Sequence, residues 1–300
     1  MKLERVDLKK TVKNNTNLLK NLDWDIMKQC ISDAEELDWE SFWQEKLKAK
    51  EDRQKDWNKA APNFGKSARR DGYHTHLVNR INPQADETIL DLGCGDGNIS
   101  VPLAKRAKFV TGVDSAEKML EKFDMKAQKE NVANYKTILE DLTRVTKDNI
   151  GNHDIVVASR SLNNVIPIKQ TLKNIDEIAN KYVYITLFGP NNWRMEKEFY
   201  QYILGKEYNE FPSHRYLFNI LVDMGIYPNV ENLDIGRPRE YSSVDEAIES
   251  GKWRLDTLGD DEILKLREYL NDVLIPNPET GKLSNPNDRA DWVLIWWKKQ

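Results

Sequence analysis

The fold of this chain is decided by the stretch Ile89-Leu90-Asp91-Leu92-Gly93-Cys94-Gly95-Asp96-Gly97. An apolar run of strand character precedes the glycines, and a helical pattern follows them. Glycines at such a turn let the backbone change direction sharply and approach a ligand closely. The N-terminus of the following helix offers free N–H donors and a favourable field for an anion. The stretch therefore predicts a strand–loop–helix unit that binds a ligand at its loop.

Outward from this loop, the sequence alternates between strand and helix patterns, as is typical of a parallel sheet with crossover helices. Continuous apolar runs such as residues 155–158 suit strands that are buried on both faces. Strands are predicted at Thr88–Leu92, Phe109–Asp114, Tyr135–Glu140, Asp154–Ser159, Tyr182–Leu187, about Val230–Ile235 and Trp292–Trp297. Helices are predicted at about 97–106, 115–130, 142–149, 168–180, 193–204 and 212–224.

An acidic residue follows the loop at the end of the second predicted strand. Asp114 comes about 20 residues after Gly93, the spacing at which a carboxylate meets ribose hydroxyls. The nicotinamide fingerprint needs Gly-x-Gly-x-x-Gly, but here the third glycine, Gly97, comes one place early and Asn98 follows it. Asp91 could meet the ammonium of an amino-acid ligand, whereas a pyrophosphate would have no use for it. A dinucleotide is therefore the poorer fit.

Taken in order, these segments resemble the motifs of class I S-adenosylmethionine-dependent methyltransferases. The segments are Ile89–Gly97, Val113–Asp114 with the helix from Glu117, Leu139–Leu142, and the fourth strand His153–Ser159. The resemblance covers residues 85–190 and extends by pattern to the last strand. It implies a Rossmann-like α/β fold: a seven-stranded, mostly parallel sheet with the last strand antiparallel and helices on both faces.

The resemblance also implies a cofactor, S-adenosylmethionine, with S-adenosylhomocysteine as its product. Asp114 is expected to bind the ribose hydroxyls, with Ser115 beside it. Asp141 is expected to reach the adenine amino group, with Glu140 as an adjacent rival, while Leu142 covers the ring. The residues expected along the methionine moiety and near the methyl group are Asp91, Gly93, Cys94, Gly95, Gly97 and Ser159.

Methyl transfer from a sulfonium is an in-line displacement, so alignment and exclusion of water are the main tasks of the enzyme. A base is needed only where the acceptor must lose a proton during attack, so no catalytic residue is assigned. The candidates for contacts with the methyl group or the acceptor are His74, His76, Arg160, Asn163 and Trp193. Since His74 and His76 are two apart on a predicted helix, at most one should point inward. No cluster has metal-ligand spacing, so no metal is expected.

Two segments lie outside this predicted sheet. Residues 1–80 are predicted to form a charged helical extension whose tryptophans pack on the main body, and residues 81–300 to form the core. Within the core, residues 237–290 form an insertion before the last strand. The insertion is predicted to hold helices at about 243–251 and 259–274, followed by a Pro/Asn/Gly-rich loop over 275–287.

Both segments are expected to act as a lid over the methyl group. The first would reach it through Tyr73, and the insertion through Tyr241, Trp253 and Leu255. Neither segment is needed to complete the sheet, and both carry aromatic side chains. We therefore expect them to enclose a pocket for a small acceptor, and not to frame an open basic groove.

Composition narrows the partners and the compartment. A formal net charge of −4 gives no general attraction for nucleic acid. No apolar run reaches the length of a membrane helix, and no apolar segment follows the charged N-terminus as in a signal peptide. The two cysteines, Cys30 and Cys94, suit reduced thiols. These features favour a cytoplasmic protein without a membrane partner, either a monomer or a homodimer.

The leading hypothesis is S-adenosylmethionine-dependent methyl transfer to a small-molecule acceptor. A methyltransferase for RNA or a protein side chain is the first alternative. The segment Ser159–Leu162 lacks the Asn/Asp-Pro-Pro-aromatic motif that would suggest methylation of base or amide nitrogens. A nicotinamide-dependent oxidoreductase is the second alternative, and a non-catalytic cofactor-binding subunit is the third.

Overall fold

A computed structural model of the chain describes residues 37–48, 56–61, 72–233, 238–251, 255, 258–289 and 291–299. By its internal contacts the chain divides after Trp39, and the elements below belong to the unit Glu40–Gln300. None of the helices in the described ranges combines the length and apolarity needed to cross a membrane.

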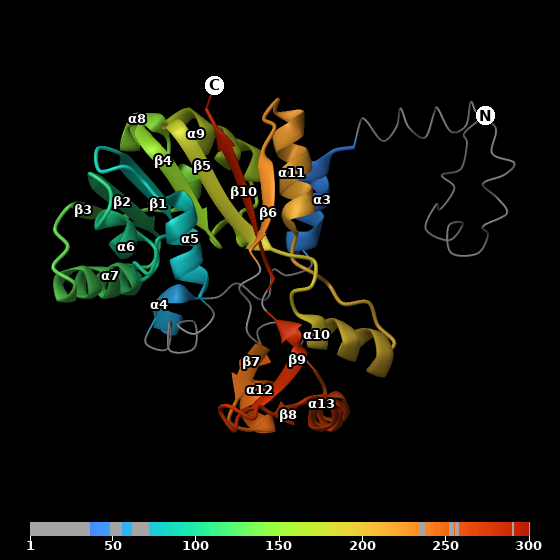
Figure 1. Ribbon diagram of the computed structural model, residues 1–300. Helices are drawn as coiled ribbons and strands as arrows, with labels where there is room; N and C mark the ends of the chain where they lie inside the picture. The colour runs from blue at the N-terminus through green and yellow to red at the C-terminus, as the bar shows by residue number, and fades with distance from the viewer. Residues whose placement is uncertain are drawn as a thin grey trace, which may run out of the picture. The chain divides into compact units, whose positions relative to one another are not determined.

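A seven-stranded sheet organises this unit, with the strand order β3-β2-β1-β4-β5-β10-β6 (Figure 1). The pairs among β1 to β5 are parallel, and β10 is antiparallel to both of its neighbours. The strands are β1 (Thr88–Leu92), β2 (Phe109–Asp114), β3 (Tyr135–Leu139), β4 (His153–Ser159), β5 (Ala179–Phe188), β6 (Asn229–Leu233) and β10 (Trp292–Lys298). The predicted sheet is confirmed. Its order reverses between β1 and β4, where such sheets bind ligands at the strands' carboxyl ends.

Most strand bounds match the prediction to within a residue, but β5 begins three residues earlier than predicted, at Ala179. Asn180 and Lys181 have low β-propensity, so local pattern did not include them. The parallel ladder with β4 starts at the pair His153–Ala179, and β10 pairs as far as Tyr182. Pairing with β4 therefore extends β5 beyond what its own residues favour.

Helices cover both faces of the sheet. Consecutive strand residues point to opposite faces, so the side chains of Trp296 and Trp297 in β10 lie on opposite faces of the sheet. Trp296 lies 4.6 Å from the guanidinium carbon of Arg80 in α5, whereas Trp297 Nε1 donates to Asp176 Oδ1 in α9 at 2.9 Å. Helices α5 and α9 therefore flank opposite faces.

The described helices are α3 (Trp39–Lys48), α4 (Trp57–Ala60), α5 (Tyr73–Ile81), α6 (Ser100–Ala104), α7 (Glu117–Lys129), the 3-10 turn η5 (Leu142–Arg144), α8 (Lys147–Ile150), the 3-10 turn η6 (Leu162–Asn164), α9 (Ile168–Ile178), α10 (Arg194–Glu198), the π-helical turn η7 (Phe199–Ile203), α11 (His214–Asp223), α12 (Val244–Gly251) and α13 (Asp260–Val273).

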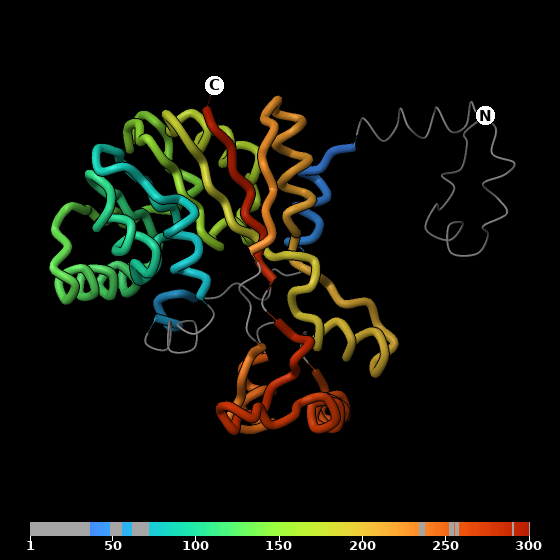
Figure 2. Tube along the Cα trace, in the orientation of Figure 1, coloured from blue at the N-terminus to red at the C-terminus, as the bar shows by residue number. Residues whose placement is uncertain are grey.

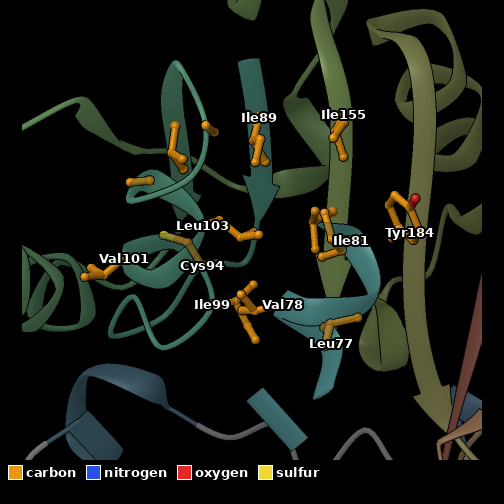
Figure 3. Close-up of a cluster of buried hydrophobic side chains, with 14 of the residues drawn as sticks. Leu77, Val78, Ile81, Ile89, Cys94, Ile99, Val101, Leu103, Ile155 and Tyr184 are labelled. Carbon is orange, nitrogen blue, oxygen red and sulfur yellow. The ribbon is translucent and has the colours of Figure 1, made fainter. Parts of the chain in front are cut away.

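The core beneath α5 shows why this helix forms. Its buried positions Leu77, Val78 and Ile81 recur at helical spacing and make one apolar stripe. Figure 3 shows this stripe facing Ile89 of β1 and Ile155 of β4. Full burial of one such aliphatic side chain stabilises the fold by about 1.5–3 kcal/mol. The stripe therefore seats α5 on the sheet next to the carboxyl ends of β1 and β4.

The insertion holds a second sheet, of order β7-β9-β8, and the predicted loop over 275–287 is therefore wrong. The trace leaves the large sheet after β6 and rejoins it at β10 (Figure 2). Pro276 lies in the two-residue edge strand β8, where a missing N–H costs least. Pro286 lies where the pairing of β9 with β7 shifts register. Both prolines thus sit at sites that tolerate them. The strands are β7 (Pro238–Tyr241), β8 (Ile275–Pro276) and β9 (Leu283–Arg289).

The tryptophans of the N-terminal extension differ in how deeply they are buried. Trp43 in α3 is fully buried, and its Nε1 donates to the carbonyl of Val165 at 2.7 Å, as the packing prediction requires. Trp57 in the single-turn α4 stays 39% exposed. Trp39 is half-buried, and Trp24 lies outside the described residues. Packing of the extension on the main body is thus confirmed for α3, because its buried stripe includes Trp43 and Leu47.

Candidate functional site

The glycine loop is bound to the end of β2 through its backbone. Gly93 N and Cys94 N both donate to the carbonyl of Val113, at 2.8 and 3.0 Å. Gly93, Gly95 and Gly97 all have positive φ, at 73°, 55° and 74°. A side chain at these positions would be strained, so glycine keeps the loop's backbone in this conformation and open to a ligand.

Two of these glycines also lie against other elements. A Cβ placed on Gly93 would overlap Ser161 Cβ, in the loop after β4. A Cβ on Gly97 would lie 2.8 Å from the ring of Phe123 in α7. The loop is therefore enclosed on two sides by β4's continuation and by α7.

Asp91 lies beneath this loop with one unpartnered oxygen. The carboxyl group is 1% exposed, and its Oδ2 accepts from Ser100 Oγ at 2.5 Å. Its Oδ1 is buried and has no hydrogen-bond partner among the described residues. Burial raises the pKa of Asp91 to about 7, an effect that the Ser100 hydrogen bond opposes and nearby Asp114 reinforces. A cationic ligand group at Oδ1 would satisfy this oxygen and stabilise the ionised carboxylate.

Asp114, at the end of β2, is half-buried and holds the loop. Its Oδ2 accepts from Gly95 N and its Oδ1 from Ala116 N, each at 2.9 Å. Burial raises the pKa of Asp114, while these backbone hydrogen bonds oppose the shift. A carboxylate has about four lone-pair directions, so two remain for ligand hydroxyls. The neighbouring Ser115 is exposed at the same edge.

Asp141 and Leu142 follow β3 at the same edge of the sheet. Asp141 is exposed and caps η5, since its Oδ1 accepts from Thr143 N at 2.8 Å and from Thr143 Oγ1 at 2.7 Å. Glu140 Oε1 in turn accepts from Asp141 N at 2.8 Å. Helix capping thus accounts for one Asp141 oxygen, and contact with an adenine stays a prediction for the other.

Several side chains meet around Arg160, which directly follows β4. Its guanidinium carbon lies 4.1 Å from the ring centroid of Tyr73 and 5.0 Å from that of Trp292. Its Nη2 lies 3.1 Å from Nε2 of His74. Because the guanidinium can only donate, His74 Nε2 accepts, and the proton of the neutral ring is on Nδ1. The structure thus brings together two of the predicted candidates, His74 and Arg160.

Tyr73 and Ser159 complete this group of side chains, the Arg160 cluster, which consists of Tyr73, His74, Ser159, Arg160 and Trp292. The Tyr73 hydroxyl is fully buried and hydrogen-bonds to Ser159 Oγ at 2.8 Å and to Thr186 Oγ1 of β5. Burial, together with the positive charges of Arg160 and Lys126, lowers the pKa of His74 to about 4. His74 is consequently neutral at pH 7 and a weak base.

The other candidates divide between the cluster and the surface. Asn163 is buried and donates Nδ2 to the carbonyl of Arg160 at 3.1 Å, so it supports that residue's backbone. Trp193 is buried, with its ring 4.3 Å from Phe188. Phe188 in turn lies 4.8 Å from Trp292 and so connects Trp193 to the Arg160 cluster. His76 is exposed and outside it, as expected if only one of the two histidines points inward.

Trp292 and Phe188 are site residues that sequence reasoning missed. Trp292 is the first residue of β10 and pairs directly with Phe188, the last residue of β5. An antiparallel last strand necessarily begins at the carboxyl edge of its parallel neighbour. The predicted antiparallel direction of the last strand therefore implied that its first residue, Trp292, lies at this edge of the sheet. Trp292 was not among the site residues predicted from the sequence. In the described ranges no group of three or more His, Cys, Asp or Glu side chains could hold a metal ion.

Comparison with known proteins agrees with this geometry. Residues 83–222 match a family model described as a methyltransferase domain. An uncharacterized protein of Haemophilus influenzae is 26% identical over 244 residues, which cover 80% of this chain and 88% of that protein. A 23S rRNA (uracil(1939)-C(5))-methyltransferase of Vibrio parahaemolyticus is 48% identical over 54 residues, only 18% of this chain and 12% of that enzyme.

Among solved structures, the YcgJ protein of Bacillus subtilis shares this fold. The TM-score is 0.53 at 14% identity, over 76% of this chain and 97% of the other. That likeness concerns the fold alone. The matched domain is a methyltransferase domain, so nothing supports the nicotinamide oxidoreductase alternative.

Proposed function

We propose that this chain, whose residues 83–222 match a family model described as a methyltransferase domain, is a class I S-adenosylmethionine-dependent methyltransferase that methylates a small-molecule acceptor at the Arg160 cluster. The observation that carries the proposal is the enclosure of the carboxyl end of β4 by Tyr73, His74 and Trp292. An aromatic, half-buried wall suits a small ligand with apolar surface. An RNA acceptor would call for a basic groove, and the net charge of −4 gives none of the general attraction it needs.

The residues present fit the cofactor. S-adenosylmethionine supplies an electrophilic methyl group on a sulfonium and leaves as S-adenosylhomocysteine. Asp91 Oδ1, buried and unpartnered, would bind the ammonium of the methionine moiety. Gly93, Gly95 and Gly97 would let the backbone approach that moiety. Asp114, which keeps lone pairs beyond its two backbone bonds, would accept from the ribose hydroxyls.

The remaining predicted contacts are assigned by their place on the same edge. Asp141 would accept from the adenine amino group and Leu142 would cover the ring, after β3. Ser159 would lie near the methyl group, after β4. The other residues that would line the cofactor are Cys94 and Ser115.

The chain's own part in the reaction is alignment and exclusion of water. His74 is a weak base, with a pKa of about 4, and its Nε2 is already engaged by Arg160. We therefore infer that His74 positions Arg160 and does not accept the acceptor's proton. Such a site favours an acceptor that attacks with an available lone pair.

We also propose that the extension and the insertion act as the lid. From residues 1–80, Tyr73 and His74 already contact the end of β4. The insertion is tied to the segment after β5, since Arg239 Nη1 lies 3.2 Å from Glu196 Oε1 in α10. Directly after the insertion, Asp291 Oδ2 accepts from Asn191 N at 2.8 Å. Tyr241 and Leu255 line a small pocket between the insertion and α10, so their lid role would be indirect. Trp253 lies outside the described residues.

Calorimetry and mass spectrometry test the proposal together. The purified chain should bind S-adenosylmethionine and S-adenosylhomocysteine, and should not bind NAD or NADP. Native mass spectrometry should find a copurifying small molecule that gains 14 mass units when S-adenosylmethionine is added, the mass of the CH2 that methylation adds. Binding of NAD alone would overturn the class. Methylation of copurifying RNA, with no small acceptor, would favour the RNA alternative.

A further inference from the structure

Arg160 is a half-buried cation that forms no ion pair with any residue in the described part of the chain. Its side chain contacts the rings of Tyr73 and Trp292 and the imidazole of His74. Cations that are removed from water are normally paired with an anion. Among the described residues, the groups that contact this guanidinium are all neutral, so none of them supplies a counter-charge.

The neighbours of Arg160 add donors and no acceptor that could neutralise it. His74 uses its one free nitrogen lone pair on Arg160 Nη2. Trp292 Nε1 is buried and lacks a hydrogen-bond acceptor among the described residues. By contrast, Arg239 in the insertion is paired with both Glu196 and Asp288, and Arg80 is paired with Glu231. The Arg160 cluster therefore has an excess of N–H donors and of positive charge.

The backbone of Arg160 is held in a conformation that a non-glycine residue adopts at a cost. Its φ is 59°, in the left-handed region, which costs an L-residue about 1–2 kcal/mol. Its N–H donates to Thr186 Oγ1 at 3.0 Å, and Asn163 donates to its carbonyl. Strain that the surroundings hold in place is characteristic of functional sites. Here it aims one long cationic side chain across the ends of β5 and β10.

The direction of the side chain separates the acceptor from the cofactor. The next residue, Ser161, is the one that lies against Gly93 of the cofactor loop. The Arg160 side chain instead lies over the ring of Trp292 of β10, and through Trp292 it adjoins Phe188 at the end of β5. The charge therefore lies toward the aromatic side of the site, where the proposed function places the acceptor.

We propose that Arg160 is the anion-binding group of the acceptor site, and that the methyl acceptor is a small molecule with a carboxylate and an apolar body. This rests on the proposed function. The guanidinium donates two parallel hydrogen bonds to the carboxylate, in the fork geometry that arginine offers. The rings of Trp292 and Phe188 contact the apolar body. The cofactor also carries a carboxylate, so the same chemistry has a second source that the experiment must separate.

Arg160→Asn is the decisive variant. Asparagine tolerates positive φ, so the substitution removes the cation without straining the backbone. Arg160→Lys keeps the charge and loses the fork. Arg215→Asn, at an exposed position on α11, is the matched control. Thermal unfolding of each variant shows whether it folds.

The probes are benzoate and benzamide, titrated by NMR into protein saturated with S-adenosylhomocysteine. Wild type and Arg215→Asn should bind benzoate at least about tenfold more tightly than benzamide, as expected for a charge-assisted bidentate pair. Arg160→Asn should abolish that preference, and Arg160→Lys should retain part of it. Equal binding of the two probes to wild type, or binding of neither, would overturn the proposal.

Calorimetry with S-adenosylmethionine and its decarboxylated analogue distinguishes the two sources of carboxylate. Arg160→Asn should bind S-adenosylmethionine within about threefold of wild type. If instead it loses tenfold or more for S-adenosylmethionine and nothing for the decarboxylated analogue, Arg160 binds the cofactor and the proposal is wrong. Failure of wild type to bind S-adenosylmethionine at all would contradict the proposed function itself.

Discussion

The two halves of the site are built in different ways. Around β1 to β3, the groups proposed to face the cofactor are backbone N–H groups, glycines and the carboxylates Asp91 and Asp114, most of them within one short stretch of sequence. Around β4, β5 and β10, they are the side chains of Tyr73, Arg160 and Trp292, which come from distant parts of the chain.

This difference separates the proposed binding of a common cofactor from the proposed binding of a particular acceptor. The half built from backbone and two acids is the one proposed to bind the cofactor, which many enzymes share. A side-chain-built half can be changed residue by residue without disturbing the loop. We therefore expect variants in the first half to alter cofactor binding, and variants in the second to leave it nearly unchanged.

Gly93→Ala should break the cofactor half most strongly. Its φ of 73° costs alanine about 1–2 kcal/mol, and overlap with Ser161 adds about 1–3 kcal/mol. Urea unfolding should show a loss of about 2–5 kcal/mol, and calorimetry should show no binding of S-adenosylmethionine. Gly225→Ala is the matched control, since φ there is 78° but nothing lies within 4 Å of the added Cβ. Equal losses in the two variants would mean that packing against Ser161 does not matter.

Asp91→Asn should change binding and stability in opposite directions. Without the charge, S-adenosylmethionine should bind about tenfold to a hundredfold more weakly. The folded pKa of about 7 lies above the ordinary value of 3.8, so ionised Asp91 destabilises the ligand-free fold increasingly as pH rises from about 4 to 7. Ligand-free Asp91→Asn should therefore be more stable than wild type at pH 8, and the two should converge below pH 4.

Urea unfolding at both pH values, with exposed Asp148→Asn as control, checks the stability of Asp91→Asn. An Asp91→Asn protein that binds the cofactor as wild type does would remove Asp91 from the site.

Asp114→Ala should weaken S-adenosylmethionine binding by at least about tenfold while the fold survives. The ribose hydroxyls would lose their acceptor, and Gly95 N and Ala116 N would lose theirs. Asp141→Ala is the informative comparison, because Asp141 is exposed and its loss should cost only about threefold. Calorimetry measures both. A larger loss for Asp141 than for Asp114 would reverse the assignment.

His74→Gln should give the smallest effect and sharpen the comparison. Burial keeps the folded pKa of His74 at about 4, against 6.5 for an ordinary histidine. The stability that this contributes is present above pH 6.5 and is lost as pH falls toward 4, because only the unfolded chain binds the proton. The loss should be about 1–2 kcal/mol after allowance for partial exposure.

Urea unfolding of His74→Gln should therefore show a smaller fall in stability between pH 7 and pH 5 than wild type shows. Exposed His76→Gln should keep the wild-type fall. Cofactor affinity should stay within about twofold in both variants. A large loss of cofactor affinity in His74→Gln would show that the two halves are coupled.

Sequence patterns predicted the structure of the proposed cofactor half well, because its strands and its loop depend on residues that are close together in the sequence. The bounds of β1 and β2, the glycine turn and the two strand-end acids all follow from residues within about 25 positions. The glycine spacing also disfavoured a dinucleotide, because Gly97 comes one place early for the nicotinamide fingerprint. Such features depend on backbone geometry, which neighbouring residues largely determine.

Local patterns failed where pairing between distant segments overrides propensity. Residues 275–287 carry loop-forming proline, asparagine and glycine, yet β9 pairs with β7 and β8 across the insertion. The starting residue of β5 was likewise decided by its ladder with β4.

The sequence by itself therefore determined the fold class, the glycine turn after β1 and the positions of Asp91 and Asp114 near the ends of their strands. Only the tertiary structure decided that the Arg160 guanidinium lies over the rings of Tyr73 and Trp292 and meets His74 but no carboxylate in the described chain. The physical reason is sequence separation: His74 and Arg160 are 86 positions apart, and Trp292 lies farther still along the chain, so no local pattern relates them. Their contact follows from the strand order and from the antiparallel direction of β10, which is a property of the whole sheet.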